Sequence, residues 1–139
     1  MAVQQLSVFA PNKNGALGDV LSTVADAGVD IRAMSIADTQ NYGIVRMIVS
    51  DPKAAEAALK GRDFLVSVNP VTVVSVSDRP GALTDVLRVL SDNGLTVEYL
   101  YAFGSGSSSA NVVMRLSDNA LASRLIETMP FADLVDSIN

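Results

Sequence analysis

The stretch Gly-Ala-Leu-Gly-Asp-Val-Leu at residues 15–21 is repeated as Gly-Ala-Leu-Thr-Asp-Val-Leu at residues 81–87, 66 positions further along the chain. A second pair of matching stretches, Met-Ile-Val-Ser-Asp at 47–51 and Met-Arg-Leu-Ser-Asp at 114–118, is separated by 67 positions. The difference of one residue indicates a single insertion in a loop between the matched blocks. Because both blocks recur in the same order, the sequence predicts one structural unit that is present twice.

The apolar pattern predicts the same elements in both copies, since alternation indicates strands and helical spacing indicates helices. The first copy has predicted strands at about 5–10, 31–38, 42–50 and 64–68, with helices after Gly15 and from Pro52 to about Lys60. The second has strands at about 71–77, 96–103, 111–116 and 134–138, with helices after Gly81 and Asp118. The predicted fold class is therefore α+β, with two ferredoxin-like β-α-β-β-α-β units at residues 1–69 and 70–139, each an antiparallel sheet with helices on one face.

The helix ends carry recognisable signals. Asn14 is a plausible N-cap of the first helix, and Gly28 is expected just beyond its last turn. Asp51 followed by Pro52 is typical of a helix start, because the carboxylate caps free amides and proline fits the first helical position. Asp118 is expected to cap the corresponding helix of the second copy.

Alternate residues of the third strand in each copy divide between two faces of the sheet. The residues assigned to the helix side are Val45, Met47 and Val49, with their matches Val112, Met114 and Leu116. The opposite face is then mixed and partly apolar, which favours packing against another subunit. We therefore expect a homodimer or a larger homo-oligomer.

The composition excludes several classes of function. The chain has no His and no Cys, which removes the commonest general bases and nucleophile partners near neutral pH. We expect no enzyme, no metal and no cofactor. The net charge of −5 counts against a nucleic-acid partner, which needs a basic surface. No secretion signal and no run long enough to span a membrane is visible, so we expect a cytoplasmic protein.

Two stretches have alternative interpretations. Val97, Tyr99, Tyr101 and Phe103 alternate along one strand, so all four are expected on one face. Base stacking is conceivable for these rings, but packing against a partner surface fits the acidic chain better. The stretch 104–109, Gly-Ser-Gly-Ser-Ser-Ser, lacks the ending of a phosphate loop and is expected to be a hairpin loop or a lid over a ligand.

The best candidate for a binding site is the first strand-to-helix turn. The two turns are Asn12-Lys13-Asn14-Gly15 and Asp78-Arg79-Pro80-Gly81. Glycine allows a sharp turn and close approach to a bound group. The amides expected to be unpaired donors at the helix N-termini are those of Ala16, Leu17, Ala82 and Leu83. Such donors suit a carboxylate, and Lys13 or Arg79 would add positive charge, although plain capping geometry is the alternative.

At these residues the chain resembles the ACT domain family, the small regulatory modules of amino-acid metabolism. The resemblance lies in the turn with Asn12 or Asp78 three residues before glycine, and in helices that end at Gly28 or Gly94. It extends to residues 42–52 and 98–103. Because it covers both copies, the whole chain is similar to stand-alone tandem ACT proteins of bacteria.

The resemblance implies amino-acid binding. ACT domains typically pair side by side into an eight-stranded sheet and hold a small amino acid between the turn of one domain and the second strand of its neighbour. Carried over by position, the first site comprises Asn12, Lys13, Asn14, Gly15, Ala16, Leu17, Ser35 and Ile36. The second comprises Asp78, Arg79, Pro80, Gly81, Ala82, Leu83, Tyr101 and Ala102. Asp78 stands where the family has a ligand-contacting Asn, so the two sites are expected to be unequal.

Three functions compete. The leading hypothesis is a regulatory module that senses a free amino acid at ACT–ACT junctions and acts in trans, with an enzyme as the partner. The alternative is a structural or interaction subunit, without a ligand, of a complex in amino-acid metabolism. An enzyme ranks third.

Overall fold

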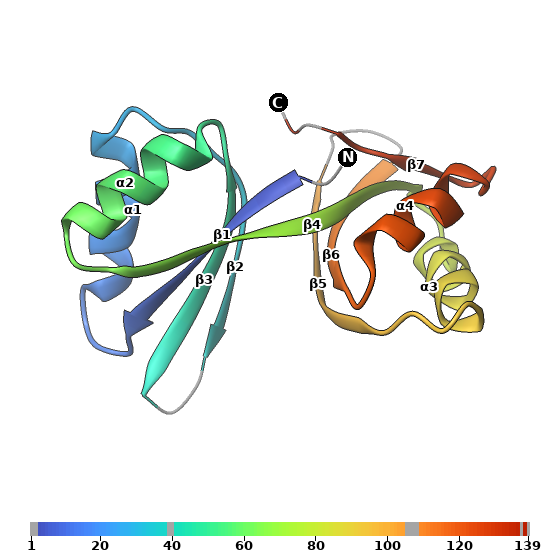
Figure 1. Ribbon diagram of the computed structural model, residues 1–139, viewed down its shortest axis with the longest axis horizontal. Helices are drawn as coiled ribbons and strands as arrows, with labels where there is room; N and C mark the ends of the chain where they lie inside the picture. Colours follow the sequence, from blue (N-terminus) through green and yellow to red (C-terminus); the bar gives the residue numbers. More distant parts are fainter. Residues whose placement is uncertain (1–2, 39–40, 105–108, 137, 139) are drawn as a thin grey trace. The chain divides into compact units, whose positions relative to one another are not determined.

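The computed structural model describes residues 3–38, 41–104, 109–136 and 138, and Figure 1 labels its elements. In chain order these are β1 (Val3–Pro11), α1 (Ala16–Asp26), β2 (Ile31–Asp38), β3 (Tyr42–Val49), α2 (Pro52–Gly61), β4 (Leu65–Ser77), α3 (Ala82–Asp92), β5 (Val97–Gly104), β6 (Ser109–Leu116), α4 (Asn119–Glu127) and β7 (Ala132–Leu134). The α+β class and the β-α-β-β-α-β order of both copies are confirmed. Residues 105–108 of the expected hairpin loop lie outside the described part of the chain.

Two strand predictions need correction. The strands predicted at 64–68 and 71–77 are one strand, β4, because Pro70 is compatible with an extended backbone and does not end it. The last strand, predicted at 134–138, is Ala132–Leu134. The chain enters the sheet directly after Phe131, where Val76 of β4 pairs with Ala132.

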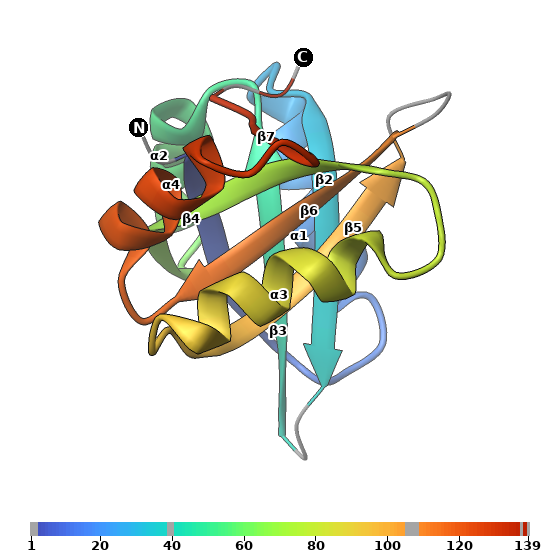
Figure 2. The same ribbon diagram turned by 90° about the vertical axis from the view of Figure 1, so that its right-hand side faces the viewer.

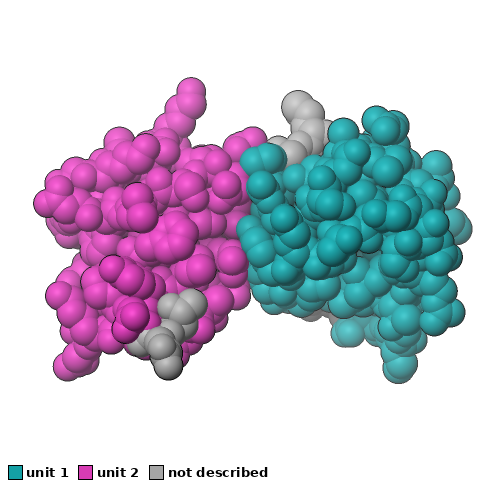
Figure 3. Space-filling model, turned by 60° about the horizontal axis from the view of Figure 1, so that its bottom comes forward, with its two compact units in different colours: residues 1–3, 70–137 teal, residues 4–69, 138–139 magenta. Residues whose placement is uncertain are grey.

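The chain divides into two compact units, which Figure 3 colours separately. The N-terminal unit comprises residues 4–69 and 138–139, and the C-terminal unit comprises 1–3 and 70–137. In the N-terminal unit the strand order is β2-β3-β1-β4, and in the C-terminal unit it is β5-β6-β4 with β7 also on β4. Strands β2 and β5 therefore each lie at an edge of their own unit. Figure 2 shows α3 and α4 on one face of the strands of the C-terminal unit.

Each unit has its own hydrophobic core between its helices and its sheet. The alternate residues of the third strands that were assigned to the helix side belong to these cores, so this assignment is confirmed; they are Val45, Met47, Val49, Val112, Met114 and Leu116. Helix α1 contributes Val20 and Val24 to the N-terminal core, and α2 contributes Leu59. All three side chains are fully buried. Removing them from water supplies the main stabilising term of a unit this small.

The helix ends follow the predicted chemistry with one exception. Asp51 accepts a hydrogen bond from the amide of Ala54, and Asp118 accepts one from Leu121, which confirms both caps. Gly28 has φ +73° after α1, and the Val29 amide donates to the Val24 carbonyl at 3.2 Å. This is the Schellman arrangement, which favours glycine.

The exception is the start of α1. Asn14 is not the N-cap; Gly15 holds that position with φ +87° and no side-chain cap bond.

An irregularity near the start of each second strand changes which residues share a face. The pairing of β5 with β6 shifts between Val97 and Tyr99. Val97 packs against the helix-side core, whereas Tyr101 pairs with Val113 on the opposite face. The expectation that Val97 shares a face with the three aromatic residues is therefore wrong. The cause is one extra residue, which breaks the alternation of side chains.

The faces of the sheets opposite the helices are only partly exposed. Ile48 and Val113 on these faces are buried, and Arg46 and Arg115 are half-buried. Arg115 donates a hydrogen bond of 2.9 Å to the Pro70 carbonyl. The face is mixed and partly apolar, as expected, but it is less exposed than an open packing surface would be, and the oligomer remains a prediction. In the described ranges, none of the helices has the length and apolar character needed to cross a membrane.

Candidate ligand sites at the strand-to-helix turns

The turn between β1 and α1 is short and closed by its own backbone. The Lys13 amide donates to the Pro11 carbonyl at 2.8 Å, and the Ala16 amide donates to the Lys13 carbonyl at 3.2 Å. The second turn repeats this geometry. The Arg79 amide donates to the Ser77 carbonyl at 2.9 Å, and the Ala82 amide donates to the Arg79 carbonyl at 3.2 Å. The two copies therefore present the same backbone conformation, which includes a φ of +87° at both Gly15 and Gly81.

The free donors lie one residue later than the sequence predicts. Ala16 and Ala82 were expected to offer unpaired amides, but the turn itself satisfies both. The amides without a partner within the described part of the chain are those of Leu17, Gly18, Leu83 and Thr84. Each helix thus offers two adjacent N–H groups at its positive end, an arrangement that suits one carboxylate.

Asn12 connects the first turn to the second strand. Its side-chain Nδ2 donates to Oδ1 of Asp38, the last residue of β2, at 2.8 Å. Its backbone amide donates to the Asn41 carbonyl at 3.1 Å. Asp38 does not stand out in the sequence as part of the site, because it lies 26 residues from Asn12. A comparison of the two copies could have pointed to Asp38. The matching residue of the second copy is Gly104, so the copies differ in charge at this position, just as they do at Asn12 and Asp78.

Asp78 and Gly104 occupy the places of Asn12 and Asp38 in the second copy. Each copy therefore has one carboxylate among these two positions. In the first copy it is Asp38, at the end of β2, and in the second copy it is Asp78, in the turn. A carboxylate beside two free amides would allow both charged groups of an amino-acid backbone to be matched. The two sites differ in the element that supplies the negative charge.

The two matched cations also differ. Arg79 forms an ion pair with Asp85 at 2.9 Å, and its other terminal nitrogen donates to the Pro80 carbonyl at 3.3 Å. Its charge is therefore directed to the first turn of α3. Lys13 is exposed and makes no ion pair among the described residues. Asn14, between Lys13 and Gly15, is exposed as well.

The predicted second-strand residues lie on the edge strands. Ile36 is 48% exposed and pairs with Val45, which places it on the helix side of the sheet. Ser35 is half-buried on the other side. In β5, Ala102 is exposed and Tyr101 is half-buried. Within the N-terminal unit, the Asn12–Asp38 bond is the link that brings the turn to the end of β2.

In the described ranges, no three of the Asp and Glu side chains come together as a metal site would require. Each turn offers two free amides that suit a carboxylate, and a carboxylate lies either in the turn, as Asp78, or hydrogen-bonded to it, as Asp38.

Two β-α-β-β-α-β units, each with the same glycine turn at the start of its first helix, define a tandem domain of the ACT type. The family model described as "ACT domain pair" matches residues 1–135, and the chain belongs to that family.

Solved structures agree with this assignment. Protein BT0572 from Bacteroides thetaiotaomicron shares 38% identity over 97% of this chain and 92% of that one, with a TM-score of 0.91. The ligand-free regulatory subunit of aspartate kinase from Thermus thermophilus shares 14% identity over 91% of each chain, with a TM-score of 0.67. The latter likeness shows the shared fold. A comparison with curated proteins found no match.

Proposed function

We propose that this ACT domain pair is a regulatory module that binds a free amino acid at its two strand-to-helix turns and acts on a partner in trans. The observation that carries the proposal is the pair of unpartnered amides at the start of each first helix, at Leu17 and Gly18 and at Leu83 and Thr84. Two matched donor pairs favour a ligand with a carboxylate. The proposed domains are residues 1–69 and 70–139.

The carboxylates beside these donors suit the other end of an amino acid. In the first site, we place the α-carboxylate of the ligand at the Leu17 and Gly18 amides and its ammonium group toward Asp38. In the second, Asp78 takes the role of Asp38. Because Asn12 donates to Asp38 at 2.8 Å, the ammonium group of the ligand would meet a carboxylate that is already oriented.

The second strand would complete each site from a neighbouring domain. Ser35 and Ile36 lie on the edge strand β2, and Tyr101 and Ala102 lie on the edge strand β5. An edge strand has backbone groups ready for pairing with another domain. A ligand that contacts both domains would favour the paired arrangement, and this preference is what couples binding to regulation.

Action in trans has support from the comparison structures. One structural neighbour is itself a regulatory subunit of aspartate kinase, from Thermus thermophilus. By analogy, we propose an enzyme of amino-acid metabolism as the partner and no catalytic role for this chain.

A thermal-shift screen against the twenty amino acids tests the proposal. A ligand present at 100 times its dissociation constant should stabilise the protein by about 2.7 kcal/mol. Calorimetry with the best ligand then gives the number of sites and their affinities. Absence of a shift with every amino acid would contradict the proposal and favour the alternative function, an interaction subunit without a ligand.

A further inference from the structure

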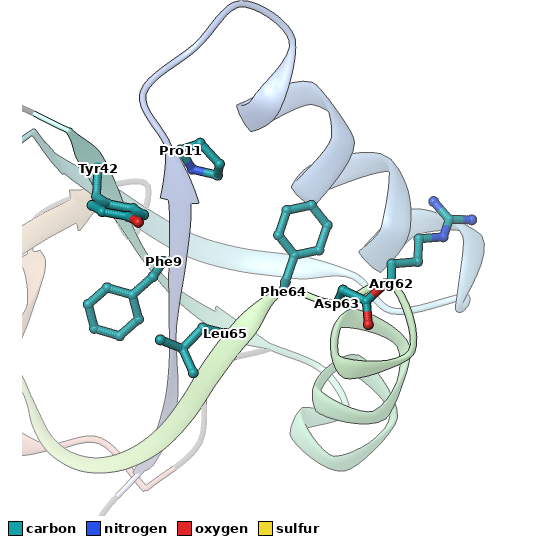
Figure 4. A pocket seen from close by; sticks show the side chains of 7 residues that line it. All are labelled: Phe9, Pro11, Tyr42, Arg62, Asp63, Phe64 and Leu65. Carbon is teal, nitrogen blue, oxygen red and sulfur yellow. The ribbon is translucent and has the colours of Figure 1, made fainter.

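A separate hollow lies in the N-terminal unit, beside the end of β1 and the start of β4. Its volume is about 410 Å³, and Figure 4 shows the side chains that line it. Its apolar lining comes from Phe9, Pro11, Tyr42, Phe64 and Leu65, and the exposed charged residues Arg62 and Asp63 lie at the rim. A mostly apolar hollow of this size with a few polar groups has the dimensions and chemistry of a small-molecule site.

The internal repeat shows that the fold does not need this lining. Phe9 and Leu65 correspond to Ser75 and Ala132, and the C-terminal unit forms the same elements with these small residues. The counterpart of Tyr42 is Ser109, because Tyr42 pairs with Pro11 at the same place where Ser109 pairs with Ser77. The bulky side chains of the hollow are thus specific to the first copy.

Phe64 behaves differently from the other lining residues. Its counterpart in the repeat is Phe131, and both rings pack against the core of their own unit. Phe64 therefore has a structural role in addition to lining the hollow. Tyr42 and Leu65, by contrast, are 54% and 68% exposed. Side chains this exposed add little apolar burial to the core of their unit, so the packing of that core does not by itself require them.

The charges at the rim are unbalanced. The Arg62 guanidinium donates to Oγ1 of Thr23 at 3.0 Å and to Asp26 at 3.1 Å, and in Figure 4 it extends away from the aromatic rings. Its charge is therefore opposed by Asp26. Asp63 forms no ion pair among the described residues. Asp63 is thus the charged lining residue that is not engaged in an ion pair within the described ranges.

We propose that Phe9, Tyr42, Phe64 and Leu65, with Asp63 at the rim, form a second ligand site that takes a small organic cation with an aromatic or aliphatic body. The faces of aromatic rings attract cations, and the Asp63 carboxylate adds a charge-assisted hydrogen bond to an ammonium group. The apolar body of the ligand would lie against Phe9 and Leu65. This site is distinct from the strand-to-helix turns.

Three ligands of one shape and different charge test the proposal on the whole chain. They are phenethylammonium, neutral 2-phenylethanol and anionic phenylacetate, each titrated into ¹⁵N-labelled protein and followed by the amide signals. We expect saturable shifts centred on residues 62–65 and Phe9. The cation should bind about three to five times more tightly than the alcohol, as expected for one exposed ion pair and cation–π contact. The anion should bind most weakly.

Variants of the lining separate the contributions. Asp63→Asn should reduce phenethylammonium affinity to that of 2-phenylethanol and leave the alcohol unchanged. The double change Phe9→Ser and Leu65→Ala copies the second repeat and should abolish binding of all three ligands. Tyr42→Ser gives an independent measure if the double variant does not fold. Ser22→Ala, on the exposed side of α1 and outside both sites, should leave phenethylammonium binding unchanged.

Clear results would overturn the proposal. Equal affinity for the three ligands would remove the role of Asp63. Shifts that centre away from residues 62–65, or binding that survives in both the double variant and Tyr42→Ser, would show that the hollow is not the site.

Discussion

At the scale of single residues, two glycines determine the geometry of the candidate sites. Gly15 and Gly81 both have φ +87°, a conformation that side chains with a Cβ rarely adopt. Around Gly15, no other atom lies within 4 Å of where a Cβ would stand. The requirement for glycine is therefore conformational and does not come from a lack of space.

Substitution of Gly15 by alanine should destabilise the protein by about 1–2 kcal/mol, the usual cost of a left-handed conformation for a residue with a Cβ. Urea unfolding measures this difference. Gly18→Ala is the matched control, because Gly18 lies inside α1 and also has open space around its Cβ position. Alanine there should stabilise by about 0.5–1 kcal/mol. Similar effects of both changes would contradict this account.

Asn12 offers a second prediction at this scale. Asn12→Ala removes the hydrogen bond that holds Asp38, so we expect amino-acid binding at the first turn to weaken by about fivefold to tenfold, as for loss of a charge-assisted bond. Calorimetry measures the affinity. Asn93→Ala is the control, since it also removes an exposed asparagine side chain but lies at the C-cap of α3, outside both candidate sites. An unchanged affinity in Asn12→Ala would contradict the proposed role.

The sequence predicts the turns but not all of their chemistry. Gly15 and Gly81 are readable because the repeat aligns them before matching helices. The Asn12–Asp38 bond is not readable, because it joins residues that only the folded hairpin brings together. The amides of Ala16 and Ala82 were expected to be free, yet the turn closes onto them, so the donor position depends on backbone geometry that residue types alone do not specify.

At the scale of elements, local capping accounts for where α2 and α4 begin. Asp51 accepts a hydrogen bond of 3.1 Å from Ala54, and Asp118 accepts one of 3.0 Å from Leu121. Both carboxylates also lie at the positive ends of their helices. These starts were predictable from sequence, because the capping residue, the bond that it accepts and the helix all lie within four residues of each other.

Removal of the first of these caps should be measurable. Asp51→Ala should destabilise the protein by about 1 kcal/mol, because the Ala54 amide loses its partner. Asp51→Asn keeps an acceptor and should lose only a fraction of that amount. Chemical denaturation compares the two variants. Equal losses would show that charge at the helix end matters more than the hydrogen bond.

Strand details were less predictable than helix starts. The shift between Val97 and Tyr99 moves Val97 to the helix side, and alternation along the sequence gives no sign of it. Pro70 illustrates the opposite error, because it looked like a break between strands and lies inside β4. In both cases the outcome depends on pairing with a partner strand, which short-range sequence does not contain.

At the scale of the whole molecule, the duplication made the fold predictable. Each copy is a short α+β unit with its own core, and agreement between the copies compensates for weak signals in either one. The candidate sites are harder to predict at this scale. We propose that their second-strand residues complete the site of a neighbouring domain, and a single copy would then contain only part of each site.

The exposed edge of β2 leads to a prediction about assembly. Met34 and Ile36 are 37% and 48% exposed on this strand, and we expect a particle of at least twice 14.6 kDa in sedimentation. Ile36→Lys should shift the protein toward single chains, because a buried charge at a paired edge is unfavourable. Ala57→Lys adds the same charge on the exposed side of α2 and should leave assembly unchanged. Single chains alone in the unmodified protein would refute the prediction.

The exchange of Asn12 and Asp38 for Asp78 and Gly104 has a consequence for signalling. Two turns with the same backbone but different charge placement would saturate at different metabolite levels. The occupancy of one chain would then rise over a wider range of ligand concentration than a single binding hyperbola covers. The protein would report gradual changes in metabolite concentration instead of a threshold.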